Sequence, residues 1–117
     1  MVDDKDWNVF REKKPIKYIF DENKTIEELR QYVDNTYNAH YSKGKYQATE
    51  FIADSGHGEG FCIGNILKYA QRYGKKGSPK DHRKDLLKVI HYTIIMLNLH
   101  DRNNKYIEPN DYGKGQL

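Results

Sequence analysis

Residues 61–98 read FCIGNILKYAQRYGKKGSPKDHRKDLLKVIHYTIIMLN. Apolar residues recur there at spacings of three and four on both sides of a basic turn at residues 75–79. This spacing is typical of one face of an α-helix, which completes a turn every 3.6 residues. The stretch therefore predicts two helices that are joined by a short turn and pack as an antiparallel pair.

The first helix is predicted over residues 61–73 and the second from Ser78 or Pro79 to residue 98 or 102. Gly74 stands where a C-terminal glycine cap belongs. Cys62 lies within an apolar helix and is expected in the core. The apolar residues expected to face inward are Phe61, Ile63, Ile66, Leu67 and Ala70 in the first helix and Leu86, Val89, Ile90, Thr93, Ile94 and Leu97 in the second.

Three weaker patterns precede this pair. Thr25 and Glu28 form a capping-box pattern, which predicts a helix over residues 25–38. A shorter helix is predicted over residues 47–54, followed by a glycine-rich loop at residues 56–60. Residues 16–20 follow Pro15 and predict a short strand or an extended arm.

The fold class that follows is mainly α, a compact helical domain of three to four helices containing an antiparallel helical pair. A length of 117 residues fits one domain. We expect an irregular or short-strand N-terminal arm at residues 1–24, a helical nucleotide-binding domain at residues 25–102, and a mobile tail at residues 103–117.

Composition excludes several classes of protein. Hydrophobic residues make up 37% and charged residues 32% of the chain, so the core must be small. The longest mostly apolar stretch, residues 89–99, is far shorter than the roughly 20 residues of a membrane span, so no membrane association is expected. The N-terminus shows no secretory signal, and one cysteine cannot form an internal disulfide. These features predict a cytoplasmic protein.

Positive charge is concentrated in one segment. Residues 62–88 contain eight lysines and arginines but only two acidic residues, whereas the rest of the chain is net negative. Asn65, Lys68 and Arg72 share one side of the first helix, opposite its apolar face. Guanidinium and ammonium groups bind phosphate oxygens, and an amide suits a base or sugar. The segment thus predicts a site for a phosphate-bearing ligand, or, equally, a solvated helix surface on which Arg72 bridges to Asp85.

Neighbouring residues would complete such a site. Lys75 and Lys76 extend the positive row into the turn, and Asp85 and Lys88 approach it from the second helix. The candidates for stacking on a base are Tyr41 and Tyr46.

The residues of this region resemble a known family. The pattern His40-Tyr41, Gly64-Asn65, Lys68-Tyr69, Arg72, Gly74-Lys75-Lys76, Asp85-Leu86, Lys88 and Tyr92 is similar to the signature of the SaV-like bacteriophage proteins. That family includes an early deoxynucleoside monophosphate kinase of a coliphage. The resemblance implies a phage-encoded protein in the host cytoplasm and nucleotide chemistry.

A kinase interpretation assigns roles to several of these residues. Phosphoryl transfer from a nucleoside triphosphate such as ATP depends mostly on positioning and on cations that neutralise charge. Lys68 and Arg72 would supply those cations, Asp85 would orient the acceptor or hold Arg72, and His40 would handle the proton. The chain has no Walker-type phosphate loop, so such a kinase would be unconventional.

Three other functions compete with this one. A non-catalytic nucleotide sensor or sponge needs the same cations without acceptor geometry. A pyrophosphatase of the MazG type needs clustered carboxylates for magnesium, which the sequence lacks. Nucleic-acid binding would suit the basic segment, but no helix-turn-helix or zinc pattern supports it.

Self-association is also expected. Tyr92, Ile95, Met96 and Leu99 widen the apolar surface of the last helix beyond what one neighbouring helix would cover. This width predicts a homo-oligomer, in which subunits could share sites.

Overall fold

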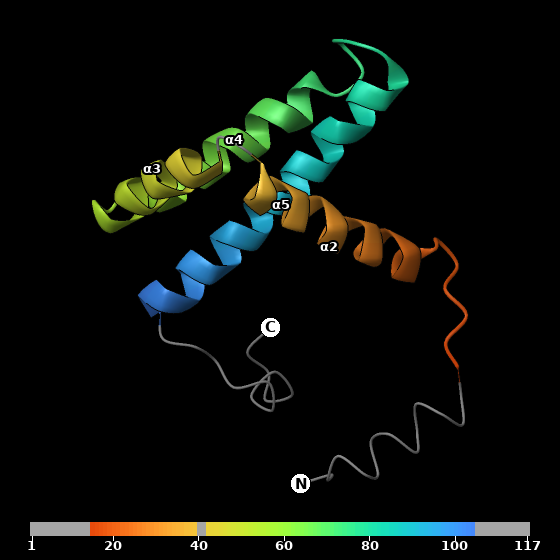
Figure 1. The fold of residues 1–117 in the computed structure, drawn as a ribbon, viewed down its shortest axis with the longest axis horizontal. Helices are drawn as coiled ribbons and strands as arrows, with labels where there is room; N and C mark the ends of the chain where they lie inside the picture. The colour runs from red at the N-terminus through yellow and green to blue at the C-terminus, as the bar shows by residue number, and fades with distance from the viewer. Residues whose placement is uncertain (1–14, 40–41, 105–117) are drawn as a thin grey trace, which may run out of the picture. The chain divides into compact units, whose positions relative to one another are not determined.

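The computed structural model describes residues 15–39 and 42–104, which contain four helices and no strand within these ranges (Figure 1). The helices are α2 (Glu22–Asn38), α3 (Ser42–Asp54), α4 (Gly58–Arg72) and α5 (Pro79–Asn104). The mainly-α prediction is confirmed. The chain divides into two compact units, one ending at Gln31 and the other beginning at Tyr32.

The structure describes residues 15–31 of the first unit, which lead into α2 and form its first part. The backbone carbonyl of Asp21 accepts hydrogen bonds from the N–H groups of Lys24 and Thr25, and the Glu22 carboxylate accepts one from the N–H of Phe20. The helix therefore starts three residues before the predicted capping box at Thr25. The short strand considered for residues 16–20 is not formed, since these residues are irregular chain and a turn.

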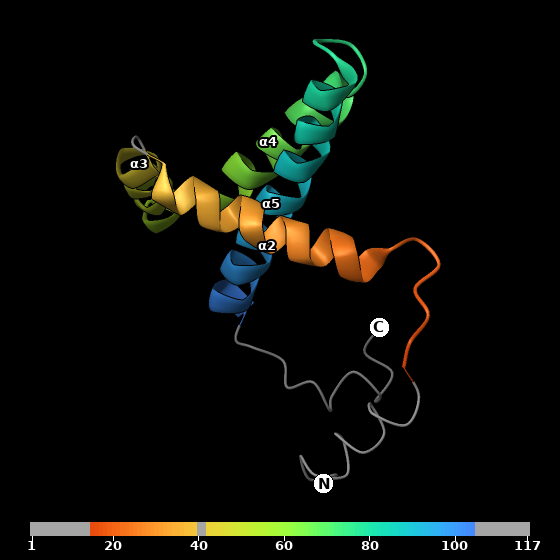
Figure 2. The ribbon, with the colours of Figure 1, turned by 45° about the vertical axis from the view of Figure 1, so that its right-hand side comes forward.

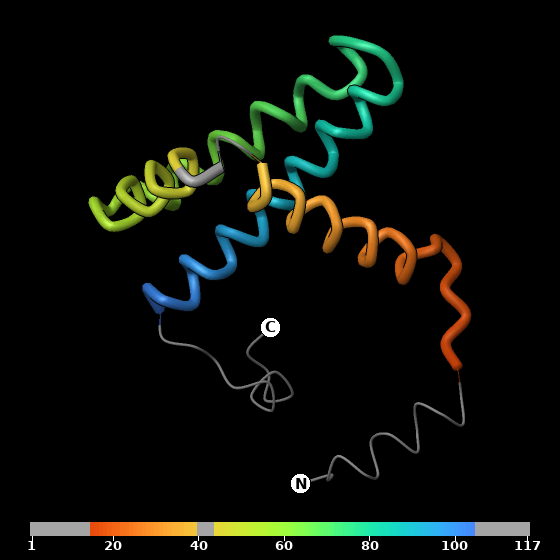
Figure 3. The backbone as a smooth tube through the Cα atoms, viewed as in Figure 1, coloured from red at the N-terminus to blue at the C-terminus, as the bar shows by residue number. Residues whose placement is uncertain are grey.

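The second unit is built on the antiparallel pair of α4 and α5, which lie side by side in two views (Figures 1 and 2). The chain reverses through residues 73–78, as the tube drawing shows (Figure 3). Gly74 follows α4 at a φ of 80°, and Ser78 precedes Pro79, the first residue of α5. The predicted pair and its turn are confirmed.

The start of α4 differs from the expected glycine loop. Gly56 lies in a turn at a φ of 92°, but Gly58 and Gly60 belong to the helix. A Cβ on Gly58 would stand 2.8 Å from Leu99 Cδ1 and 3.0 Å from the Cα of Ala53. Glycine at this position therefore allows α3, α4 and α5 to approach one another closely, which composition alone did not indicate.

We call the line along which α4 and α5 face each other the seam. Arg72 bonds Asp85, the rings of Tyr69 and Tyr92 stack with centroids 6.1 Å apart, and Gly58 meets Leu99. Successive seam positions in each helix are three and four residues apart, as in a coiled coil. The seam positions are Gly58, Cys62, Asn65, Tyr69 and Arg72 in α4 and Asp85, Lys88, Tyr92, Ile95 and Leu99 in α5.

The seam corrects the prediction of which helix faces pack together. Ile63 and Leu67, expected to face inward, are exposed, as are Ile90 and Leu97. Cys62 is fully buried, as expected. The expected bridge from Arg72 to Asp85 is confirmed. Together with the stacked rings it turns this side of α4, which was expected opposite the packed apolar face, towards α5.

A cluster of aromatic rings lies beside the pair, within the second unit. Tyr37 and Tyr46 stack with centroids 4.2 Å apart, and the Tyr46 hydroxyl hydrogen-bonds to Thr36. His91 lies 5.9 Å from Tyr32, in an edge-on arrangement, and 6.4 Å from Tyr46. These rings connect the end of α2 and α3 to one side of α5.

None of the helices in residues 15–39 and 42–104 combines the length and the apolarity that crossing a membrane requires. The N-terminal residues 1–14 and the tail from residue 105 lie outside the described residues.

Gly77 is expected to be the residue of the turn that tolerates substitution least. Its φ is 85°, and an added Cβ would stand 2.6 Å from Asp81 Oδ2 and 2.7 Å from Asp81 Cβ. Gly77→Ala should lower the free energy of unfolding by about 1–2 kcal/mol, because a side chain disfavours this conformation. Urea unfolding monitored by circular dichroism measures the change.

Gly64→Ala is the matched control for this substitution. An added Cβ meets nothing within 4 Å there, and the position is helical, so alanine should raise stability by up to about 1 kcal/mol. Equal effects of the two alanines would contradict the role assigned to the turn.

His91 should make stability depend on pH. Burial lowers the pKa of His91, with Lys45 contributing in the same direction. The folded state then binds a proton less readily than the unfolded chain, whose histidine pKa is about 6.5. Stability is therefore complete above that pH and declines as the pH falls towards 5. Thermal unfolding between pH 8 and 5 should show this decline, and His91→Phe should flatten it; an unchanged slope would count against His91.

Candidate anion-binding site

Three cationic side chains gather around the ring of Tyr69, and we call them the cation cluster. Lys68 Nζ lies 5.1 Å, Arg72 Cζ 5.0 Å and Lys88 Nζ 4.8 Å from the ring centroid. Lys68 and Arg72 belong to the last turns of α4, whereas Lys88 comes from α5. The antiparallel register brings Lys88 opposite Tyr69. The ring attracts cations through its quadrupole and holds three like charges close together.

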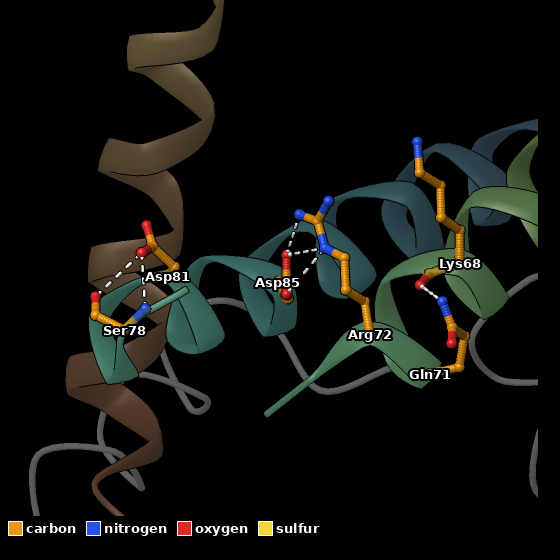
Figure 4. Close-up of polar contacts among 6 residues, drawn as sticks. All are labelled: Lys68, Gln71, Arg72, Ser78, Asp81 and Asp85. Atoms are coloured by element: carbon orange, nitrogen blue, oxygen red, sulfur yellow. Dashed lines mark hydrogen bonds and ion pairs between the residues drawn. The ribbon is translucent and has the colours of Figure 1, made fainter. Parts of the chain in front are cut away.

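Arg72 is fixed by Asp85 across the seam (Figure 4). Its Nε donates to both Asp85 oxygens at 3.2 Å, and its Nη2 donates to Oδ1. The Asp85 side chain is only 2% exposed, whereas that of Arg72 is 29% exposed. The N–H groups of Nη1 take no part in these contacts. Asp85 thus holds the Arg72 guanidinium group through Nε and Nη2, and the Nη1 side of the group is not used by this pair.

The ionisation of the pair follows from this geometry. The hydrogen bonds from Arg72 hold the pKa of Asp85 below its usual range, although burial opposes them. The same bonds raise the pKa of Arg72. Both groups therefore stay charged at neutral pH.

A second carboxylate lies at the start of α5. Asp81 Oδ2 accepts hydrogen bonds from the Ser78 backbone N–H at 2.9 Å and from the Ser78 hydroxyl at 3.0 Å. The backbone bond is the main reason that the pKa of Asp81 is lowered. This arrangement caps the helix and fixes the turn beside the cation cluster.

A hollow of about 370 Å³ opens beside this turn. It is lined by Arg72, Lys76, Gly77, Asp81 and Asp85. Arg72 of the cation cluster, Lys76 of the turn and the two carboxylates therefore all border it. Its volume is near the lower end of small-molecule pockets. Lys68 and Arg72 point to the same side of α4 in Figure 4, so an anion could contact both.

The other predicted site residues are divided between several places. Asn65 is half-buried at a seam position and its amide donates to the Phe61 carbonyl, 2.9 Å away. Lys75 is exposed in the turn. Tyr46 lies apart from the cation cluster, in a hollow of about 520 Å³ that Tyr37, His91 and Arg102 also line. His40 and Tyr41 lie outside the described residues.

Sequence reasoning gave Tyr69, Tyr92 and Asp81 no role in the site, although both tyrosines belong to the signature quoted above. Tyr69 lies between Lys68 and Arg72 and precedes Lys88 by nineteen residues, so only the register of the hairpin shows that it organises all three. The Ser78–Asp81 pair did carry a readable signal, because its spacing of three is that of a capping box.

The donor groups of the described residues do not gather into a metal site. Among the residues that the structure describes, no three histidine, cysteine, aspartate or glutamate side chains are grouped so that they could hold a metal ion. The carboxylates nearest the cation cluster, Asp81 and Asp85, bond Ser78 and Arg72 instead.

Removal of the Asp85 charge should destabilise the antiparallel pair of α4 and α5. Asp85→Asn leaves the Arg72 charge without its buried partner, so the unfolding temperature should fall by several degrees. Because the pKa of Asp85 is lowered by folding, this contribution is present above about pH 4 and is lost as the pH falls further. Thermal melts monitored by circular dichroism measure both effects.

The double variant Arg72→Met/Asp85→Leu serves as the control. It replaces both charges by apolar groups of similar size, which are often tolerated where a single charge is not. It should recover most of the lost stability, and a melt as low as that of Asp85→Asn would show that the charge itself is not the cause.

One comparison with known proteins matches the region of the chain in which the candidate site lies. A model of a family described as proteins of unknown function (DUF3310) matches residues 33–93, which include α3, α4 and the first part of α5. No curated protein and no solved structure matches the chain. Since the matched region spans more than half of the 117 residues, the chain belongs to the DUF3310 family of proteins of unknown function.

Proposed function

We propose that this chain is a phage-type nucleotide-binding protein that holds the phosphates of its ligand on the cation cluster. The observation that carries the proposal is the convergence of Lys68, Arg72 and Lys88 within 5.1 Å of one tyrosine ring, beside a hollow of nucleotide-fragment size. Cations held close together at a surface attract a polyanion more strongly than the same charges spread out.

The contacts of each residue suit a separate part of such a ligand. Arg72 is preorganised by Asp85, so little side-chain freedom is lost when it binds a phosphate oxygen. Lys68 and Lys88 approach from different helices and would contact phosphate oxygens from two sides. Lys76 extends positive charge into the hollow at the turn.

A catalytic form of this proposal is phosphoryl transfer between nucleotides. The bond from the γ-phosphorus of a triphosphate such as ATP to its bridging oxygen would break, and a bond to a phosphate oxygen of a deoxynucleoside monophosphate would form. The products are the two diphosphates. The cation cluster would neutralise the charge that develops on the transferred group. The resemblance to the SaV-like proteins supports this form, since the residues that carry it include Lys68, Tyr69, Arg72 and Asp85.

One observation favours a non-catalytic nucleotide binder as the second candidate. Asp85 accepts hydrogen bonds from Arg72 on both oxygens, and its pKa is lowered. A carboxylate held in this state positions Arg72 and is a poor proton acceptor. Such a binder would act as a nucleotide sensor or as a sponge for a signalling nucleotide. In either form we propose that the chain acts in the host cytoplasm as a homo-oligomer.

Binding can be tested by calorimetry with ATP, deoxynucleoside monophosphates and inorganic phosphate. Lys68→Ala and Lys88→Ala should each weaken nucleotide binding about tenfold, because each removes a charge-assisted hydrogen bond. Tyr69→Leu should weaken it as well, whereas Tyr69→Phe keeps the ring and should not. Binding should also weaken as salt is added.

Lys80→Ala is the matched control, since Lys80 is an exposed lysine of the same basic segment at the start of α5. Equal weakening by Lys80→Ala would indicate diffuse charge instead of a site, and the absence of nucleotide binding would overturn the proposal. Formation of ADP from ATP and each monophosphate then separates the two forms, because binding without turnover leaves the non-catalytic one.

A further inference from the structure

The hollow of about 520 Å³ in the second unit is lined by three helices, and we call it the aromatic hollow. The lining residues with polar or aromatic side chains that matter below are Tyr37 of α2, Tyr46 and Glu50 of α3, and His91, Asn98 and Arg102 of α5. Those from α3 and α5 are four or seven residues apart, so each set lies on one side of its helix. Packing of these helices therefore forms the hollow without a ligand.

The aromatic wall of this hollow is fixed by contacts within the chain. The rings of Tyr37 and Tyr46 stack with centroids 4.2 Å apart and planes only 5° from parallel. The Tyr46 hydroxyl hydrogen-bonds to Thr36, and His91 lies 6.4 Å from the Tyr46 ring. Tyr37 is nevertheless 61% exposed. A planar molecule could stack on Tyr37 with little further loss of side-chain freedom, because Tyr46 already holds that ring.

The polar groups of the hollow both donate and accept hydrogen bonds. The exposed Asn98 amide offers a donor and an acceptor, and the exposed Glu50 carboxylate accepts. His91 is neutral at pH 7, because burial lowers its pKa, so one ring nitrogen can donate and the other accept. Such a set matches the edge of a heteroaromatic ring, which alternates donors and acceptors.

The charges of the hollow differ from those of the cation cluster. Among its described lining residues the charged ones are Glu50 and Arg102, and Arg102 Nη2 already lies 3.7 Å from Asp54 Oδ1. A phosphate group placed there would lie near Glu50, and the cation beside it already has a carboxylate partner. The hollow therefore favours an uncharged molecule over a nucleotide.

We infer that the aromatic hollow binds an uncharged, planar heteroaromatic molecule of the nucleobase or nucleoside class. The ring stacks on Tyr37, and its edge bonds Asn98 and Glu50. Tyr46 supports the ring that makes this contact. The volume lies within the range of small-molecule pockets, which are mostly apolar with a few placed polar groups. The inference does not rest on phosphate binding at the cation cluster, and the two can fail separately.

Titration of the full chain with deoxyadenosine, deoxyguanosine, deoxycytidine and thymidine tests this inference by calorimetry and amide NMR. At least one nucleoside should bind once per chain and shift the amide signals of Glu50 and Asn98. Tyr37→Ala should weaken binding about tenfold or more, because it removes the stacking surface, whereas Tyr37→Phe keeps the ring and should not. Asn98→Leu changes an exposed residue and should weaken binding severalfold through lost hydrogen bonds.

Tyr73→Ala is the matched control, since Tyr73 is a 50% exposed tyrosine that does not line the hollow. It should leave nucleoside binding unchanged, as should Lys68→Ala and Lys88→Ala in the cation cluster. Circular dichroism checks that each variant keeps its helix content; if Tyr37→Ala does not, Asn98→Leu decides. Absence of binding by all four nucleosides, equal weakening by Tyr73→Ala, or loss of binding in Lys68→Ala would overturn the inference.

Discussion

The ion pair between Arg72 and Asp85 determines how the two long helices face each other. Asp85 is almost completely buried, and a buried carboxylate is tolerated only where a cation and hydrogen bonds compensate it. Arg72 supplies both, so the side of α4 that carries Arg72 must face α5. The positions of Tyr69 and Lys88 follow from the same register, since both lie within one helical turn of the pair. The surface chemistry of the hairpin is therefore a consequence of one polar contact.

The seam has two halves of different character. Near the turn it contains the ion pair and the stacked rings of Tyr69 and Tyr92, whereas at the far end the buried residues are Cys62 and Leu99. The apolar half resembles an ordinary coiled-coil contact and needs no charged partner. The polar half gains specificity of register, because a shift by one turn would separate Arg72 from Asp85. The cation cluster and the pairing of the helices thus share the same residues near the turn.

Much of the fold was readable from the sequence, including the helical pair and the contact of Arg72 with Asp85, but the apolar faces that pack together were not. The turn at residues 75–79 and the start of α5 at Pro79 followed from local chemistry that acts within a few residues. Periodicity showed that apolar stripes exist on both helices, yet it could not show which partner each stripe meets. The exposure of Leu67 and Leu97 is the result, since the pairing of Arg72 with Asp85 rotates those stripes away from the seam. The cations were predictable as a group, whereas their arrangement around Tyr69 required the register of α5 against α4.

The single cysteine gives the hairpin a built-in reporter of its own opening. Cys62 is fully buried in the seam, and burial raises the pKa of its thiol. A protonated, enclosed thiol reacts slowly with alkylating reagents, so labelling of this chain proceeds through conformations in which α4 and α5 have separated. The rate of thiol labelling therefore measures how often the two helices part, without any introduced probe.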